Sequence, residues 1–261
     1  MNDWQTLASA ITSCRACPRL VAWREEVARV KRRAYREETY WGQPVPGFGD
    51  PHARVLIIGL APAAHGANRT GRMFTGDSSG DFMYAALHRA GFASQPISRR
   101  RDDGLALQDI FISAACRCAP PDNKPRPAEL AACRPFLEQE IALLAGLRIV
   151  VGLGRIAFDV ALRLSPVQSV IPNLFGPNMG RSAAQGEKPV FAHAATYPLA
   201  GGRWLIASYH PSRQNTQTGR MTAAMFDQVW LRARQLLSQE SGDRSQTVFP
   251  IPHSAFPIPH S

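Results

Sequence analysis

Residues 55–81 read VLIIGLAPAAHGANRTGRMFTGDSSGD. The apolar residues at the start predict a buried strand, and an amphipathic segment over 81–90 predicts a helix. The residues between them are too rich in Gly, Pro and Asn for regular structure. In an open α/β sheet, ligands bind just beyond the carboxyl end of a strand, which is where this loop lies. It carries one carboxylate, Asp77, and one aromatic ring, Phe74, and so suits a flat polar ring held beside an acid. An ordinary surface loop is the alternative.

Short apolar runs alternate with amphipathic segments along most of the chain. We expect strands over 54–59, 109–114, 148–153 and 203–209, and helices over 81–90, 127–144, 155–164 and 221–237. This alternation is typical of α/β proteins, so we predict a three-layer αβα fold with a central, mostly parallel four-stranded sheet. Residues 165–202 look irregular, with a candidate short strand at 190–194.

The two ends of the chain differ from this central part. Residues 3–36 predict helix and carry one basic face, made by Arg29, Lys31, Arg32, Arg33 and Arg36. Beyond 238, the sequence Phe-Pro-Ile-Pro-His-Ser occurs at 249–254 and again at 256–261. Its alternate prolines remove backbone donors that helices and sheets need. We therefore expect a single domain over 1–237 with an N-terminal helical region, and a disordered or loosely docked tail over 238–261.

The charge of the chain is strongly positive. The net charge is +10, and only three of the basic residues are lysines, namely Lys31, Lys124 and Lys188. Arginine pairs with phosphate through two parallel hydrogen bonds, so this balance favours a nucleic-acid partner. Compositional drift in an Arg-rich genome is the alternative. No apolar run reaches the roughly 20 residues of a membrane span. The first residues also lack the pattern of a signal peptide, so we expect a cytoplasmic protein without a membrane partner.

Five cysteines are present, an odd number that argues against a disulfide framework. Cys14 and Cys17 have the spacing of a metal knuckle, and Cys118 and Cys133 bracket a Pro-rich segment. Four thiolates suit either Zn²⁺ or an iron–sulfur cluster. Inert buried thiols are the third interpretation.

A second polar motif, His210-Pro211-Ser212-Arg213-Gln214-Asn215, follows the last expected strand. His210 should therefore lie on the same sheet edge as the loop with Asp77, because the carboxyl ends of parallel strands share an edge. The residues after Pro211 offer short polar groups and one cation, which suit phosphates or a DNA duplex. A structural histidine is the alternative.

A third pattern, Gly152-x-Gly154-x-x-Ala157, formally fits the dinucleotide-binding fingerprint. The acidic residue expected about 20 positions later is missing, because no carboxylate occurs near 167–172. We therefore expect no nucleotide cofactor, and assign Gly154 to close packing of a strand against a helix.

On these motifs the chain resembles the family 5 uracil-DNA glycosylases. The likeness rests on Gly59–Ala63 with Phe74–Asp77, on the His210 motif, and on the cysteines, and it runs from about residue 3 to about 237. In family 4 an acid follows the glycine of the first strand, where this chain has Leu60. Family 4 also ends the second strand with an Asn, where this chain has Ala114. The likeness to family 5 implies broader substrate tolerance.

The resemblance implies a monofunctional DNA glycosylase of base excision repair. It would hydrolyse the N-glycosidic bond of uracil, and of other deaminated or damaged bases, and leave an abasic site. Asp77 would stabilise positive charge at C1′ and orient water, His210 would donate to uracil O2, and Asn123 would approach the base or its water. The expected substrate-binding residues are Leu60, Ala61, Pro62, Ala63, Phe74, Ala114, Ser212, Arg213, Gln214 and Asn215.

The resemblance also implies a 4Fe–4S cluster held by Cys14, Cys17, Cys118 and Cys133, with Cys116 free. We expect a monomer that acts on DNA in the nucleoid. The competing hypothesis is a non-catalytic iron–sulfur or zinc protein that binds nucleic acid, which would need neither Asp77 nor His210. A nucleotide-dependent oxidoreductase is a third hypothesis, weakened by the missing acid.

Overall fold

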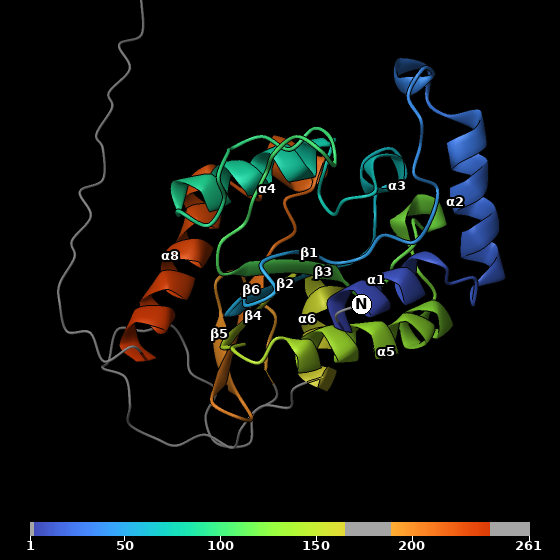
Figure 1. Ribbon diagram of the computed structural model, residues 1–261. Helices are drawn as coiled ribbons and strands as arrows, with labels where there is room; N and C mark the ends of the chain where they lie inside the picture. Colours follow the sequence, from blue (N-terminus) through green and yellow to red (C-terminus); the bar gives the residue numbers. More distant parts are fainter. Residues whose placement is uncertain (1–2, 165–188, 241–261) are drawn as a thin grey trace, which may run out of the picture.

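The computed structural model describes residues 3–164 and 189–240, and its six strands form one sheet in the order β1-β3-β2-β4-β6-β5 (Figure 1). The strands are β1 (Phe48–Gly49), β2 (Val55–Gly59), β3 (Ile110–Ala114), β4 (Ile149–Leu153), β5 (Thr196–Leu199) and β6 (Arg203–Ser208). Neighbours among β3, β2, β4 and β6 run parallel, whereas β1 and β5 pair antiparallel at the two edges.

The four predicted strands are confirmed, each within one residue of its expected ends. The expected number of strands was too low because both edge strands carry weak signals. β1 has only two residues, and in β5 only Tyr197 and Leu199 are buried. The strand expected at 190–194 is wrong, since the chain turns there: Ala194 has a φ of 61°, and the Ala195 N–H donates to the Ala192 carbonyl.

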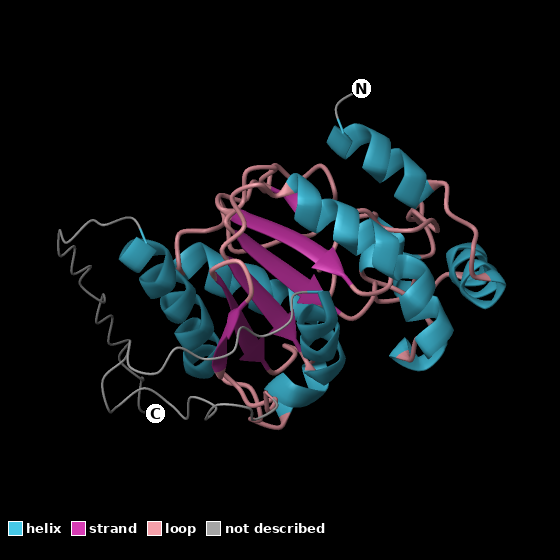
Figure 2. Cartoon of the chain, turned by 90° about the horizontal axis from the view of Figure 1, so that it is seen from below, coloured by secondary structure: helices cyan, strands magenta, loops and turns pink. Residues whose placement is uncertain are grey.

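The helices are α1 (Asp3–Thr12), α2 (Pro18–Val30), α3 (Ala67–Thr70), α4 (Ser78–Arg89), α5 (Pro127–Leu143), α6 (Arg155–Leu164), α7 (Arg213–Gln217) and α8 (Ala223–Glu240), with short 3-10 turns η1 (Arg33–Tyr35) and η2 (Pro121–Asn123). α4 and α8 cover one face of the sheet, and α1, α5 and α6 lie on the other (Figure 1). The view from below shows the strands side by side between these helices (Figure 2). The predicted three-layer architecture is therefore confirmed.

Burial along β2 explains its continuous apolar sequence. Val55 and Ile57 pack into the core under α4 and α8, whereas Leu56 and Ile58 pack into the core on the opposite face. All five residues of β2 are buried, as expected for a strand covered on both faces. This strand is therefore a rigid base for the loop that follows it.

The N-terminal region departs from the prediction of helix over 3–36. Two helices form there, and residues 13–17, which include Cys14 and Cys17, separate them. Pro18 explains the break, since proline is tolerated in the first turn of a helix but not in its interior. The predicted basic face is also divided, because α2 ends at Val30 and Lys31 has a φ of 57°.

At the C-terminus, α8 continues to Glu240, three residues past the expected boundary of 237. The repeated tail sequence and residues 165–188 lie outside the described residues. Within 3–164 and 189–240, the helices are all too short or too polar to cross a lipid bilayer.

Candidate functional site

The loop after β2 reaches across the sheet edge to the residue that follows β6. The Phe74 ring stacks on the His210 ring, with centroids 5.8 Å apart and an interplanar angle of 30°. β4 lies between β2 and β6 in the sheet, so this contact spans the end of β4. Gly59 leaves room for the ring, because a Cβ there would lie 3.1 Å from Phe74. The two motifs that were expected on one edge are thus in direct contact.

Phe74 has a strained backbone. Its φ is 52°, in the left-handed region, which is a genuine outlier for a bulky residue. Such conformations cost on the order of 1–3 kcal/mol and cluster at active sites and ligand clamps. Gly80 permits the conformation, since a Cβ there would lie 1.8 Å from the Phe74 carbonyl oxygen. The surrounding loop therefore fixes the ring at the sheet edge.

Asp77 is the N-cap of α4, a structural role that was not expected from the sequence. Its Oδ1 accepts a hydrogen bond from the Gly80 N–H at 2.9 Å, and the helix therefore starts at Ser78 rather than at residue 81. The carboxylate also lies against Gly66, where a Cβ would come within 2.0 Å of Oδ2. Burial raises the pKa of the Asp77 carboxyl, while the N–H groups of Gly80 and Ser79 oppose the rise.

His210 is half-buried, and its surroundings favour the neutral ring. Burial lowers the pKa of His210 to about 4, so the imidazole is uncharged near neutral pH. A neutral imidazole carries one N–H donor. The turn is held by Asn215, whose amide donates to the His210 carbonyl at 2.8 Å and whose N–H donates to Ser212 Oγ at 3.3 Å. Of the four polar residues predicted after Pro211, Arg213 and Gln214 are exposed, whereas Ser212 and Asn215 form this internal support.

The first residues of the loop are tied to β3. Gly59 pairs with Ala114, and the Cys116 N–H donates to the Leu60 carbonyl at 2.9 Å. Ala114 is 1% exposed and offers no polar side-chain group. Ala61 packs against the cysteine cluster described below, Pro62 is buried, and Ala63 accepts the N–H of Asn68. The predicted residues from Leu60 to Ala63 therefore connect the loop to β3, to the cysteine cluster and to α3.

Asn123 follows the Pro120-Pro121 turn after β3. It is exposed at the end of η2, with a φ of 55°. In the part of the chain that the structure describes, no hydrogen bond joins it to Asp77 or His210.

The close packing of strand against helix that was expected at Gly154 occurs at Gly152 instead. A Cβ on Gly152 would lie 2.8 Å from Phe158 Cα, so Gly152 permits the close approach of α6. Gly154 instead has a φ of 88° and donates its N–H to the Ser208 carbonyl at 2.7 Å. The fingerprint glycines thus join β4 to the end of β6, next to His210.

Two buried arginines fix the loop, and no local sequence pattern indicates them because their partners are distant. Arg69 donates to the carbonyls of His65 and Gly76, each at 2.8 Å, pairs with Glu38 and stacks on Tyr35. Arg72 is 3% exposed and contacts the segment 98–103. Arg69 thus holds the Gly76 carbonyl, and Arg72 donates to the Thr75 hydroxyl at 3.0 Å, so both arginines brace the loop just before Asp77.

The cysteines gather on the other side of Ala61. Cys116, Cys118 and Cys133 are buried in one cluster with Leu20, and Cys17 packs against it. Cys17 also interacts electrostatically with Cys14 and Cys133. A hydrogen bond from Cys116 lowers the pKa of Cys133 below that of an ordinary thiol. Over 3–164 and 189–240, no three His, Cys, Asp or Glu side chains form a site for a single metal ion.

Two buried guanidinium groups adjoin these thiols. Arg24 Nη1 donates to Cys118 Sγ at 2.9 Å, and the charge of Arg117 acts on Cys133. The Nε of Arg24, and the Nε and Nη1 of Arg117, are buried without a hydrogen-bond partner. Buried donors of this kind are costly unless they face an acceptor or an anion. The donor set therefore fits an anionic group held by thiolates.

Comparisons with known proteins identify the family of this chain. The family model of the Uracil DNA glycosylase superfamily matches residues 46–234, a span that includes both the Asp77 loop and the His210 turn. A type-5 uracil-DNA glycosylase of Thermus thermophilus is 53% identical over 234 residues, which cover 90% of this chain and 98% of the relative. One from Mycobacterium tuberculosis is 50% identical over 90% of this chain and 82% of its own. One from Pyrobaculum aerophilum is 39% identical over 88% and 92%.

Proposed function

The chain belongs to the type-5 uracil-DNA glycosylases of the uracil-DNA glycosylase superfamily, and on this basis we propose that it hydrolyses the N-glycosidic bond of uracil in DNA and leaves an abasic site for base excision repair. The observation that carries the proposal is the contact between the strained Phe74 ring and His210, in a loop that also holds Asp77. A protein that only binds nucleic acid has no need of this arrangement.

The proposed reaction begins with extrusion of the base, because the glycosidic bond is inaccessible inside a stacked duplex. Positive charge then develops at C1′ while uracil leaves as an anion. In this proposal Asp77 stabilises the cation and orients water. His210 supplies a neutral N–H to the leaving oxygen, and a donor placed in advance at developing charge is worth about 3–4 kcal/mol in comparable sites.

The flipped base needs a surface on which to stack, and Phe74 is our candidate. Its ring already stacks on His210 and its carbonyl lies close to Gly80, so a base would meet a ring that the protein itself positions. Ala114 beside Gly59 has no polar group to read the edge of the base. We therefore propose that hypoxanthine, ethenocytosine and hydroxymethyluracil are also accepted. We also propose that Asn123, which is exposed at the end of η2, approaches the base or its water.

We further propose that Cys14, Cys17, Cys118 and Cys133 hold a 4Fe–4S cluster. The two buried arginines support the proposal, since Arg24 donates to Cys118 Sγ and the charge of Arg117 acts on Cys133, so that both would offset the negative charge of the cluster. Hydrolysis needs no electron, so the cluster would supply a structural cross-link between the N-terminal helices and the segment 118–133. Ala61, which packs on the cysteines, would transmit that rigidity to the catalytic loop.

The experiment that tests the function is a uracil-containing oligonucleotide incubated with the protein and then treated with alkali. Cleavage at uracil, and none in a matched thymine oligonucleotide, is the expected result. Binding without cleavage would favour the nucleic-acid-binding protein instead.

We also propose that the enzyme works as a monomer on nucleoid DNA in the cytoplasm.

A further inference from the structure

The segment between α4 and β3 carries three consecutive arginines, Arg99, Arg100 and Arg101, all of them exposed. The proposed reaction does not use them. A run of surface charge is usually no more than a solvated face. Here, however, the backbone of all three residues is held by buried or half-buried groups, which a solvated face does not require.

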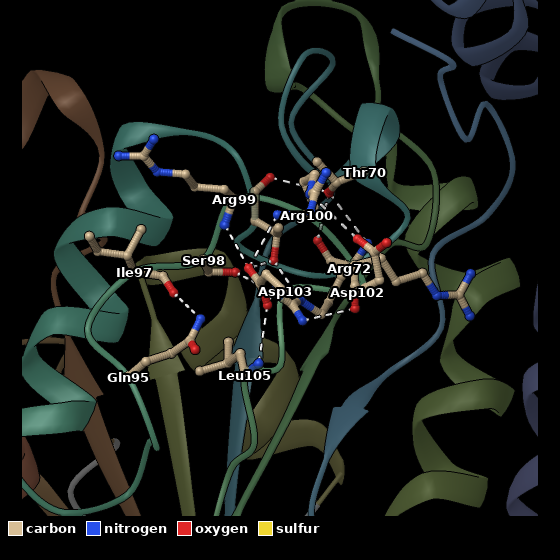
Figure 3. Close-up of polar contacts among 12 residues, drawn as sticks. Thr70, Arg72, Gln95, Ile97, Ser98, Arg99, Arg100, Asp102, Asp103 and Leu105 are labelled. Atoms are coloured by element: carbon tan, nitrogen blue, oxygen red, sulfur yellow. Dashed lines mark hydrogen bonds and ion pairs between the residues drawn. The ribbon is translucent and has the colours of Figure 1, made fainter.

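Asp103 is the first of these anchors. Its Oδ2 accepts the N–H groups of Arg99 at 2.8 Å and Arg100 at 3.2 Å (Figure 3). Its Oδ1 accepts the Leu105 N–H at 3.2 Å and Arg72 Nη2 at 2.7 Å. These hydrogen bonds lower the pKa of Asp103 against the effect of burial. One carboxylate thus fixes the turn from which the arginine side chains project.

Arg72 is the second anchor, and it joins this segment to the catalytic loop. Its Nη1 donates to the Arg101 carbonyl at 3.1 Å, and its Nη2 donates to Ser98 Oγ at 2.8 Å. Ser98 also hydrogen-bonds Thr75 through its hydroxyl, and its carbonyl accepts the Gly76 N–H at 3.0 Å. Gly76 directly precedes Asp77. The arginines are therefore connected by hydrogen bonds to the backbone next to the proposed catalytic carboxylate.

The arginine side chains have only weak or non-ionic partners. Arg100 pairs with Asp102 at 3.6 Å, and both side chains are at least three-quarters exposed, so this pair contributes little. Arg101 lies over the Trp41 ring, 4.6 Å from its centroid. The charge of Arg99 acts on Asp81, in the first turn of α4. These guanidinium groups can therefore bind phosphate with little free energy lost in breaking their present contacts.

The surface beside Arg101 is hollowed. One hollow, of about 510 Å³, is lined by Arg101, Gln43 and residues of α1. A second, of about 480 Å³, shares Thr12, Ser13 and Gln43 with it and reaches Arg15 and Glu25, which pair with each other. Arg101 therefore borders open surface that a ligand can reach.

We propose that Arg99, Arg100 and Arg101 form a preorganised clamp for the DNA phosphate backbone beside the Asp77 loop. The clamp deepens the proposed function, on which it rests for the identity of its ligand. Arginine forks match phosphate oxygens in pairs, and such contacts fix the position of a protein on a duplex. Holding the loop in place before binding reduces the entropy that binding costs.

The test measures binding of the full chain to a duplex that contains a tetrahydrofuran abasic site, as a function of salt. This probe has no base to excise, so the result is independent of glycosylase activity, which is measured separately on uracil DNA.

In the variant R99A/R100A, the backbone N–H donors to Asp103 remain. We expect the slope of log K against log salt to become shallower by about 1.8, or about 0.9 for each phosphate that the variant no longer neutralises. The control R89A/R134A removes equal charge from exposed helical positions and should keep the wild-type slope. Equal slopes in the two double variants would overturn the clamp.

Two further variants, at the neighbouring residues Asp102 and Asp103, distinguish an effect of preorganisation on DNA binding from an effect of net charge. Asp102→Asn and Asp103→Asn each remove one negative charge, and electrostatics alone predicts tighter DNA binding for both. Asp102 is exposed, whereas Asp103 anchors the arginine backbone. We expect D102N to bind as tightly as wild type or more tightly, and D103N to bind more weakly despite its added positive charge. Tighter binding by D103N would contradict the clamp.

Discussion

Phe74 and His210 stack on each other although they follow different strands, and the contact bridges the end of β4. The pairing brings the aromatic ring of the first motif to the imidazole of the second. Asn215 holds the His210 carbonyl, and Arg69 holds the carbonyl of Gly76, two residues after Phe74. Groups fixed in this way by the protein suit electrostatic catalysis, which depends on donors that are placed in advance.

His210 should act in the chemical step. His210→Ala removes the proposed donor to the leaving base, so we expect the single-turnover rate on a U·G duplex to fall on the order of 10²-fold or more. The fold and DNA binding should change little, because the hydrogen bonds of the turn use the backbone of His210 and the side chains of Ser212 and Asn215. His88→Ala, at the end of α4, is the matched control. A rate close to wild type for His210→Ala would show that His210 is structural.

Gly66 should be required for excision, because the absence of a side chain there leaves room for the Asp77 carboxylate. A Cβ there would lie 2.0 Å from Asp77 Oδ2, and the φ of Gly66, −101°, lies outside the left-handed region. We expect the displaced carboxylate to slow excision by about 10²-fold while Asp77 itself is intact. Gly146→Ala is the control, since the nearest atom to its Cβ would be 3.7 Å away. Equal activity in the two variants would show that the position of the Asp77 carboxylate is unimportant.

The rate should depend on pH through Asp77 rather than through His210. Burial raises the pKa of Asp77, and the reaction needs the ionised carboxylate, so activity should fall as pH drops through a value above the ordinary pKa of about 4. His210, with a pKa of about 4, stays neutral until lower pH and should add no limb between pH 5 and 8. Single-turnover rates from pH 4 to 8 test this. An acid limb that persists in Asp77→Asn would assign the titration to another group.

The iron content of cysteine variants should identify the ligands. Cys118 Sγ accepts a hydrogen bond from Arg24, whereas the Cys116 thiol donates a hydrogen bond to Cys133. We therefore expect Cys118→Ala to lose the visible absorption of the cluster and Cys116→Ala to keep it, in protein prepared anaerobically. The reverse pattern would make Cys116 the ligand, and stoichiometric zinc without iron would replace the cluster by a zinc site.

Much of the fold could be predicted because the central strands are continuous apolar runs, of which β2 is the clearest. The common edge of the Asp77 loop and the His210 turn followed from parallel strand order. The edge strand β5 was misplaced because only alternate residues are buried. The break before α2 was missed although Pro18 signals a helix start.

The supports of the site could not be predicted because they depend on partners far apart in the sequence. Arg72 is held by Asp103 and Ser98, and no local pattern links these positions. The capping role of Asp77 had a local signal, since an Asp before two serines is a common helix start. The resemblance to a known family implies a catalytic role for Asp77 and says nothing of a helix cap.

The most direct test of the central claim is single-turnover excision of uracil from a U·G duplex by Asp77→Asn. Asn caps helices about as well as Asp, so this change keeps the start of α4 while removing the charge. We predict a folded protein that binds abasic duplex like wild type and excises uracil on the order of 10²-fold more slowly or worse. Excision at the wild-type rate would contradict the proposed mechanism, because Asp77 would then serve only as a helix cap.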